Sequence, residues 1–193
     1  MQCIKGILYL IFRMKSSYLT AELTYGDYIK GITLAKNPKY IVEFGILDGY
    51  SLKSFIESSD ETCKIDAFDI FEEFNGNHSD YSKMISQFNN YPRINIHRGN
   101  FYESLNLFKD KSIDIIHIDI ANTGEIVPMV EKYLLKLCDD GIIILEGGST
   151  ARDENTWMKK YNKLPLHPAL KSIKNIKYYT CGSIPSITII KKM

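Results

Sequence analysis

The residues best placed for chemistry lie in the segment Tyr40–Ser51, where a short apolar run carries Glu43 near its end and Gly45 and Gly49 follow. Apolar residues then recur at helical spacing, so the segment predicts a buried strand, a tight turn and the start of a helix. Glycine adopts backbone conformations that other residues avoid and lets a ligand approach the main chain. The N–H groups at a helix start favour a phosphate or a carboxylate. We therefore expect this turn to bind a small, partly negative ligand.

Two well-known nucleotide-binding motifs do not match this turn. The segment lacks the Gly-Lys-Ser/Thr ending of the phosphate loop, and Leu47 stands where the dinucleotide motif G-x-G-x-x-G has its second glycine. A plain strand–helix connection that uses glycine for compactness explains the two glycines as well as a binding turn does. The turn alone does not decide between these two interpretations.

Acidic residues stand at or just after the ends of four apolar runs, and a fifth run ends at Arg98. In open α/β sheets, ligands bind outside the carboxyl ends of the strands. A carboxylate is costly to bury without a partner. A single acidic residue is better explained by a strand that ends where the chain returns to water, whereas the repeated placement predicts a polar ligand cleft. The acidic residues are Glu43, Asp69, Asp119 and Glu146.

The elements that must position these residues alternate along the chain. Short Ile-rich runs predict buried parallel strands, and helical patterns lie between them. The alternation predicts an α/β fold: a doubly wound, mostly parallel seven-stranded sheet with a C-terminal antiparallel hairpin and an N-terminal helical extension. The predicted strands are Tyr40–Phe44, Lys64–Phe71, Arg93–Arg98, Asp114–Asp119, Gly141–Glu146, Lys177–Cys181 and Ile184–Lys191; the predicted helices are Tyr81–Phe88 and Glu125–Cys138, with one or two more in Ser17–Ala35.

Size and composition narrow the class of protein. The 193 residues fit one domain, divided into a helical extension, residues 1–38, and an α/β core, residues 39–193. The formal net charge of +1 provides no basic field for nucleic acid. Four widely spaced cysteines without a C-x-x-C pair predict reduced thiols in a cytoplasmic protein.

The apolar segment Ile4–Met14 is interrupted by Lys5 and Arg13, and it is shorter than the roughly 20 residues that a membrane span requires. No small-residue cleavage site of a secretory signal follows it. We expect a helix that packs on the domain or on a partner chain, which leaves a homodimer open. We expect no stable membrane span.

The motifs and their order resemble those of class I S-adenosylmethionine-dependent methyltransferases, most closely the small-molecule O-methyltransferases of the macrocin and catechol type. Val42–Ser51 resembles the first motif, and Ala67–Phe74 resembles the Phe-Asp-x-Phe-Glu-Gly segment of the macrocin type. Ile116–Asp119 and Gly141–Glu146 resemble the fourth and fifth motifs. The likeness covers about residues 40–148 and the terminal hairpin. It implies a Rossmann-like enzyme that transfers a methyl group from S-adenosylmethionine to a small-molecule or sugar acceptor, at oxygen.

The resemblance also assigns roles to residues of the predicted cleft. The turn backbone would hold the methionine carboxylate with help from the Ser51 hydroxyl, and Glu43 would hold the amino group directly or through water. Asp69 would accept hydrogen bonds from the two ribose hydroxyls. Phe71 would line the adenine pocket, although core packing explains it equally well. The implied cofactor residues are Glu43, Gly45, Ile46, Leu47, Asp48, Gly49, Tyr50, Ser51, Asp69, Ile70, Phe71, Asn100 and Phe101.

Methyl transfer to oxygen also needs a base, or a metal that lowers the pKa of the acceptor. Metal-dependent relatives carry an Asp after the fourth strand, and an acidic residue followed by Asp or Asn after the fifth. Here Asp119 matches the first ligand, Glu146 replaces the second, and Gly147 stands at the third. Asp119 or Glu146 as general base is therefore the simpler hypothesis. The same two carboxylates with water would form a weaker Mg²⁺ site.

Other residues near these motifs allow more than one interpretation. His117 shares a sheet face with Asp119, and a core histidine with satisfied hydrogen bonds is the favoured explanation. Ser149–Trp157 forms either a substrate lid or a packed segment with Arg152 solvated. The missing third metal ligand is compatible with a cofactor-binding module without catalysis. The failed G-x-G-x-x-G motif argues against a dehydrogenase.

Overall fold

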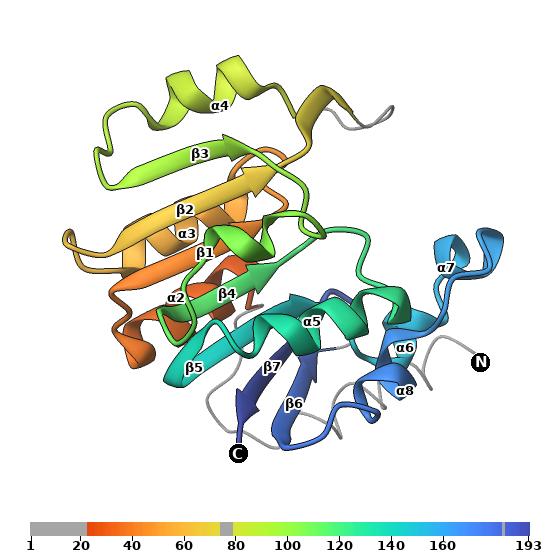
Figure 1. Cartoon of the computed structure of the whole chain (residues 1–193). Helices are drawn as coiled ribbons and strands as arrows, with labels where there is room; N and C mark the ends of the chain where they lie inside the picture. Colours follow the sequence, from red (N-terminus) through yellow and green to blue (C-terminus); the bar gives the residue numbers. More distant parts are fainter. Residues whose placement is uncertain (1–22, 74–78, 183) are drawn as a thin grey trace.

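The computed structural model describes residues 23–73, 79–182 and 184–193. The segment Ile4–Met14, together with Phe74 and Ser183, lies outside the described residues, so the predictions for these positions stay untested. Within the described ranges, helices and strands alternate, and helices cover both faces of one sheet (Figure 1). No helix in these ranges is both long enough and apolar enough to cross a membrane.

The sheet has seven strands in the order β3-β2-β1-β4-β5-β7-β6. The first five in this order run parallel, whereas β7 runs antiparallel to both of its neighbours. The predicted fold, including the C-terminal antiparallel hairpin, is thereby confirmed. The strands are β1 (Tyr40–Phe44), β2 (Lys64–Asp69), β3 (Ile94–Arg98), β4 (Ile113–Ile118), β5 (Leu137–Glu146), β6 (Ile176–Gly182) and β7 (Ser186–Lys192).

Apolar side chains form one packed cluster on each face of the sheet. On one face, Ile115 of β4 packs with residues of α2, α3 and α4; on the other, Ile116 packs with residues of α5 and α8. Successive strand residues point to opposite faces, so one Ile-rich strand supplies both clusters. The helices are α2 (Tyr25–Lys36), α3 (Tyr50–Ser58), α4 (Tyr81–Phe88), α5 (Val127–Tyr133), α6 (Thr150–Asp153), α7 (Thr156–Lys160) and α8 (Leu166–Leu170).

The helix α2 has clear start and stop signals. Thr24 and Asp27 form a capping box at its first turn, and Asn37 adopts a left-handed conformation at its end, directly before Pro38. The capping box satisfies backbone donors that the first helical turn leaves unpaired. These signals place Tyr25 at the first position of α2, from which its hydroxyl reaches the centre of the sheet.

The helix predicted over Glu125–Cys138 is wrong at its C-terminal end. A 3-10 turn over Gly124–Ile126 leads into α5, and β5 already begins at Leu137. Leu137 is fully buried and pairs with Ile113 of β4. Its apolar side chain fills a strand position that happens to continue the helical spacing of the preceding residues.

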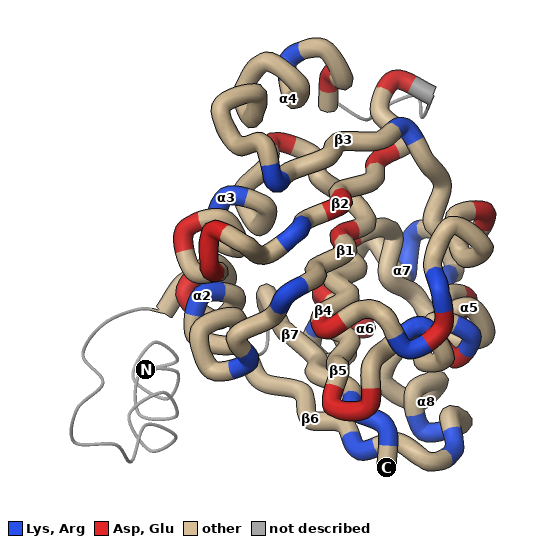
Figure 2. Tube along the Cα trace, turned by 60° about the vertical axis from the view of Figure 1, so that its left-hand side comes forward, with Lys and Arg blue, Asp and Glu red and all other residues tan. Residues whose placement is uncertain are grey.

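Basic and acidic side chains are interspersed over most elements. Figure 2 shows Lys and Arg residues spread over several helices and loops, with Asp and Glu residues between them. Such an arrangement agrees with the balanced charge of the sequence.

Candidate functional site

The glycine turn after β1 forms where the ends of two parallel strands approach each other. Gly45 has φ +90°, and a Cβ atom there would lie 1.9 Å from the backbone oxygen of Asp119. Gly49 has φ +77°, and a Cβ atom there would lie 2.7 Å from the ring of Phe88. Both glycines are therefore required by backbone conformation and by close contact. Compact packing and ligand binding are compatible at this turn, because the first allows the second.

Asp69, at the end of β2, holds the glycine turn. Its Oδ2 atom accepts hydrogen bonds from the backbone N–H groups of Ile46 and Leu47 at 2.7 and 3.1 Å. Its Oδ1 atom accepts one from the N–H of Phe71 at 2.8 Å. These bonds tie the end of β2 to the backbone of the turn and of the following 3-10 helix. Sequence reasoning assigned Asp69 to a ligand and missed its role in shaping the turn.

A cavity of about 380 Å³ opens at the carboxyl ends of β1 to β4. Its size falls in the roughly 300–1,000 Å³ range of small-molecule sites. The structure brings together in its wall predicted residues from all four strand ends: Gly45, Leu47, Asp69, Ile70, Asn100, Phe101 and Asp119. Gly99, from the strand end Arg98–Asn100 predicted at the cleft, also lines it. Sequence reasoning missed other lining residues that are adjacent in the chain to the predicted ones: Phe44, Phe68, Tyr102, Ile120 and Ala121.

Several predicted cofactor residues lie outside this wall. Phe71 is fully buried and packs edge-on against Tyr81 with ring centroids 5.1 Å apart, which fits the core-packing explanation. Ile46 is buried in the same core cluster. The side chains of Asp48 and Tyr50 are exposed beside the turn. Gly49 is the N-cap residue of α3, which has no side-chain capping bond at that end.

Glu43 belongs to a buried chain of hydrogen bonds that crosses the sheet. Its Oε1 atom accepts from the Ser51 hydroxyl at 2.5 Å and lies 2.9 Å from Nδ1 of His117. The other ring nitrogen of His117 lies 2.9 Å from the hydroxyl of Tyr25 on α2. The expected core histidine with satisfied hydrogen bonds is confirmed. Sequence reasoning missed Tyr25, because 92 residues separate it from its partner.

The network leaves one acceptor atom without a bond. Oε2 of Glu43 is buried and has no hydrogen-bond partner among the described residues. Such an atom is costly unless a donor reaches it. Burial, and then the charges of Asp119, Glu146 and Glu43, raises the pKa of Tyr25, so its hydroxyl keeps its proton.

Asp119 follows β4 and borders the cavity, where its side chain is only partly exposed. Its backbone N–H donates to the carbonyl of Phe44 at 2.8 Å, which fixes the residue beside the glycine turn. Burial raises the pKa of Asp119 to about 6; the carboxylates of Glu146 and Glu43 add to the rise, while His117 and Arg152 oppose it. A carboxylate with this pKa is suited to accept a proton near neutral pH.

Glu146, at the end of β5, is bound by a guanidinium group. Nη2 of Arg152 lies 3.0 Å from Oε2 of Glu146, and Nε donates to Oε1 at 3.4 Å. Arg152 is buried, so the explanation of this residue as solvated is wrong. Its guanidinium lies 5.5 Å from the centre of the Trp157 ring. Glu146 is absent from the cavity wall, which leaves Asp119 as the predicted base that borders the cavity.

These contacts do not fit a divalent cation at Asp119 and Glu146. Both carboxylate oxygens of Glu146 already face the guanidinium of Arg152. At the third ligand position, Gly147 supplies no side chain, and a Cβ atom there would lie 3.6 Å from Nε of Arg152. A cation at this site would have to compete with a fixed positive charge.

Asn122 is a buried positioning residue that sequence reasoning missed. Its Nδ2 atom donates to the backbone carbonyls of Ile118 and Glu146 at 2.7 and 2.8 Å. The amide thereby joins the ends of β4 and β5, after which Asp119 and Gly147 follow. No pattern around Asn122 marked it, since its partners are backbone groups on two strands.

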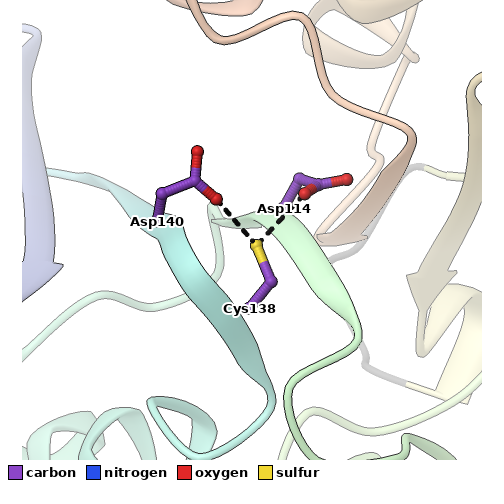
Figure 3. Close-up of side chains that lie close together, drawn as sticks. All are labelled: Asp114, Cys138 and Asp140. Carbon is purple, nitrogen blue, oxygen red and sulfur yellow. Dashed lines mark hydrogen bonds between the residues drawn. The ribbon is translucent and has the colours of Figure 1, made fainter.

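Another group of acidic residues and a thiol lies at the opposite edge of the sheet (Figure 3). The thiol of Cys138 lies 3.1 Å from a carboxylate oxygen of Asp114 and 3.3 Å from one of Asp140. Asp114 also accepts from two backbone N–H groups before β1, and Asp140 is paired with Lys36 at 2.5 Å. Each carboxylate already has partners, so these contacts join α2, β1, β4 and β5 without a metal ion.

The chain is similar to known proteins in sequence pattern and in fold. Residues 42–146 match the family described as methyltransferase domain. No curated protein matches the sequence at a significant level.

Solved structures with the same fold include the SAH-bound methyltransferase PaMTH1 of Podospora anserina, with 16% identity, a TM-score of 0.66 and coverage of 98% of this chain and 87% of that one. The O-methyltransferase of Bacillus cereus in complex with SAH has 15% identity, a TM-score of 0.67 and coverage of 100% and 91%. The O-methyltransferase TomG of Streptomyces achromogenes, in complex with SAM, has 12% identity, a TM-score of 0.65 and coverage of 98% and 88%. At these identities the likeness shows a shared fold. The family match, in contrast, covers more than half of the chain and includes the glycine turn, Asp69 and Asp119, and the chain therefore belongs to the methyltransferase-domain family.

Proposed function

We propose that this methyltransferase transfers a methyl group from S-adenosylmethionine to an oxygen atom of a small molecule, with Asp119 as the general base. The observation that carries the proposal is the cavity between the glycine turn, Asp69 and Asp119. Known proteins with this fold have been solved with SAM or SAH, which supports the choice of methyl donor.

The donor's polar groups are matched by groups at the carboxyl ends of β1 and β2. The first turn of α3 starts at Gly49 without a side-chain cap, so its N–H groups are suited to hold the methionine carboxylate. The unpartnered Oε2 of Glu43 is suited to the ammonium group, directly or through water. Asp69 lines the cavity as the acceptor proposed for the ribose hydroxyls, and Ile70 and Phe101 provide apolar surface for the adenine ring.

The reaction that this arrangement favours is an in-line displacement. S-adenosylmethionine supplies an electrophilic methyl group; the acceptor oxygen forms a bond to its carbon as the carbon–sulfur bond breaks. Asp119 accepts the proton of the acceptor hydroxyl at its carboxylate, and the largely apolar cavity wall excludes water. Alignment of donor and acceptor by the rigid strand ends supplies much of the rate enhancement.

The same proposal includes the domain organisation and the setting of the protein. Residues 39–193 form the catalytic core, which contains the family match, and residues 1–38 form an extension that contributes Tyr25 to the site. The described cysteines are free thiols, which supports a reducing compartment such as the cytoplasm. A sugar as the acceptor, and a homodimer formed through the N-terminal segment, are the narrower forms of this proposal.

A second function is favoured by the ion pair between Glu146 and Arg152. With this carboxylate engaged and Gly147 at the third ligand position, a protein that binds the cofactor without catalysis is the alternative. The two functions share the cofactor cavity and differ only in whether Asp119 receives a proton from an acceptor.

The test begins with cofactor binding by isothermal titration calorimetry, with S-adenosylhomocysteine and NAD as competing candidates. We expect S-adenosylhomocysteine to bind with one-to-one stoichiometry and NAD not to bind. Methyl transfer from labelled S-adenosylmethionine is then measured against a panel of catechols, phenols and sugars. Binding without transfer to any acceptor would favour the non-catalytic module, and binding of NAD alone would overturn the proposal.

A further inference from the structure

The neighbouring parallel strands β4 and β5 are each followed by or end in a carboxylate. A divalent cation at this site would need both carboxylates as ligands. Asp119 follows β4 and Glu146 ends β5. Asn122 ties these two strand ends through bonds to the carbonyls of Ile118 and Glu146. A cation held by these two carboxylates would need a free oxygen atom of Glu146.

A guanidinium group faces both carboxylate oxygens of Glu146. Arg152 approaches with two nitrogen atoms: Nη2 lies 3.0 Å from Oε2 and Nε lies 3.4 Å from Oε1. Two-point contact between a planar guanidinium and a carboxylate is the strongest common form of an ion pair. The side chain of Arg152 is only 11% exposed, so water screens this pair weakly.

The local backbone is built to hold Arg152 in this place. The hydroxyl of Ser149 accepts from the backbone N–H of Arg152 at 3.0 Å and caps α6. Gly147, with φ +96°, lies beside the guanidinium, and a Cβ atom there would be in ordinary contact with Nε at 3.6 Å. The ring of Trp157, 5.5 Å from the guanidinium carbon, flanks the charge from α7. The cap of α6 and the Trp157 ring of α7 therefore both position one cation.

We infer that the Arg152 guanidinium takes the place of a divalent cation beside Glu146, so that this methyltransferase works without a bound metal ion. The inference rests on the proposed function. A guanidinium neutralises Glu146 but offers no open coordination position to an acceptor oxygen. Removal of the acceptor's proton then depends on Asp119, and Arg152 acts as a positioning residue that supplies a fixed positive charge.

Binding of Mn²⁺ to the apo protein, followed by electron paramagnetic resonance, tests this inference without reference to catalysis. At submillimolar Mn²⁺, we expect the wild-type chain to show no Mn²⁺ binding that the substitution Glu146→Gln removes. The variant Arg152→Ala should gain such binding, because it exposes Glu146 beside Asp119, and the double variant Arg152→Ala/Glu146→Gln should lose it again. Mn²⁺ binding to the wild type that Glu146→Gln abolishes would overturn the inference.

Activity provides the second readout. Methyl transfer by the wild type should be unchanged after removal of metals with EDTA, and Arg152→Ala should lose at least about tenfold in kcat/KM and recover part of it with Mg²⁺. Arg152→Lys keeps the charge without the two-point contact, and its kcat/KM should lie between those of the wild type and Arg152→Ala. Loss of wild-type activity with EDTA that Mg²⁺ restores would contradict the inference. Arg98→Ala is the matched control, since Arg98 forms an exposed pair with Glu72 and lies over the Tyr81 ring.

The two possible failures are distinguishable. If the wild type fails to bind S-adenosylhomocysteine, the proposed function fails, while the Mn²⁺ titration still reports on the site at Glu146. If Arg152→Ala does not fold, as judged by circular dichroism, the wild-type titration and the Arg152→Lys variant decide the question. Equal Mn²⁺ binding by the wild type and by Arg152→Lys would then contradict the inference that the two-point contact of the guanidinium excludes the cation.

Discussion

The strands β4 and β5 carry acidic residues at both of their ends, and the two ends behave differently. At the amino end, Asp114 and Asp140 are bound by backbone N–H groups, by Lys36 and by the thiol of Cys138 (Figure 3). At the carboxyl end, Asp119 borders a cavity of about 380 Å³. The same residue types on the same strands therefore form a structural junction at one edge and a candidate active site at the other.

The difference follows from the direction of the parallel strands. At the carboxyl end, β1 leads through the glycine turn into the start of α3, whose N–H groups and dipole favour an anionic ligand. Side chains at positions 45 and 49 would fill the space around this turn. Gly45 and Gly49 leave that space open, and the cavity lies beside the turn. At the amino end, the loops enter the strands, and the acidic side chains satisfy the N–H groups of those loops. A cluster of acidic residues becomes a site only where the backbone leaves space beside it.

Replacement of one carboxylate by an amide at each of the two edges should produce the largest difference in activity between the edges. Asp119→Asn removes the proposed base without changing the shape of the side chain, and we expect kcat/KM to fall by about 10²–10⁴-fold. Asp114→Asn, at the other end of β4, should keep activity close to that of the wild type. Steady-state kinetics with labelled S-adenosylmethionine measure both. An equal loss in the two variants would mean that the edges do not differ in function.

A methyl group added to the glycine turn should produce the next largest effect. In Gly45→Ala the new Cβ atom would meet the backbone oxygen of Asp119, at a φ of +90° that alanine rarely adopts. We expect a loss of about 2–5 kcal/mol in the free energy of unfolding, together with loss of S-adenosylhomocysteine binding. Urea unfolding and calorimetry measure the two effects.

Gly31→Ala is the matched control for this substitution. Gly31 lies inside α2, and an added Cβ would meet no atom within 4 Å among the described residues outside the backbone of its own helix. Alanine is the better helix former by about 0.5–1 kcal/mol, so this variant should be slightly more stable than the wild type and should bind normally. Equal destabilisation at both positions would remove the argument that the turn is shaped by close contact.

Because the pKa of Asp119 is raised, its charged carboxylate should lower the free energy of unfolding at neutral pH. Burial disfavours the charge and raises the pKa of Asp119 from its ordinary value of 3.8 to about 6 in the folded state. Between these values the folded state binds more protons than the unfolded state, so the contribution of Asp119 to stability is lost as the pH rises through about 6. Asp119→Asn should therefore be more stable than the wild type by about 1–2 kcal/mol at pH 7.5, after allowance for its partial exposure.

The pH dependence of that gain separates it from a packing effect. Near pH 4 the carboxyl group is protonated in the folded state, and the variant should lose its advantage. Urea unfolding at pH 4, 6 and 7.5 measures the trend. A gain that stays constant across these values would show that the charge of Asp119 is not its cause.

Sequence patterns predicted those features that depend on local backbone demands. The glycine turn, the alternating elements and the acidic strand ends at Asp69 and Asp119 could be read because each is encoded by neighbouring residues. The pairing of Tyr25 with His117 and of Arg152 with Glu146 could not, since it depends on how separate elements pack. No periodicity records such contacts.

The patterns also misled where one residue type serves two purposes. The apolar Leu137 continued a helical spacing but lies in β5, where strand pairing determined its conformation. Phe71 lies two residues after the ribose-type acidic residue, and its ring packs in the core, in line with the core-packing explanation that the sequence left open. Both cases involve apolar residues, whose burial alone does not distinguish a helix from a strand or a core from a ligand pocket.

The smallest effect is expected at the amino edge, where Cys138→Ala removes the thiol between two carboxylates. Burial and the neighbouring Asp114 and Asp140 raise the pKa of Cys138 to about 12, so the thiol stays protonated and is a poor metal ligand. Loss of its weak hydrogen bonds should cost about 1 kcal/mol or less, with unchanged activity. Thermal unfolding with and without Zn²⁺ measures this, and Zn²⁺ should shift the wild type and the variant equally. Stabilisation by Zn²⁺ of the wild type alone would identify the amino edge as a metal site and would reverse the comparison between the two edges.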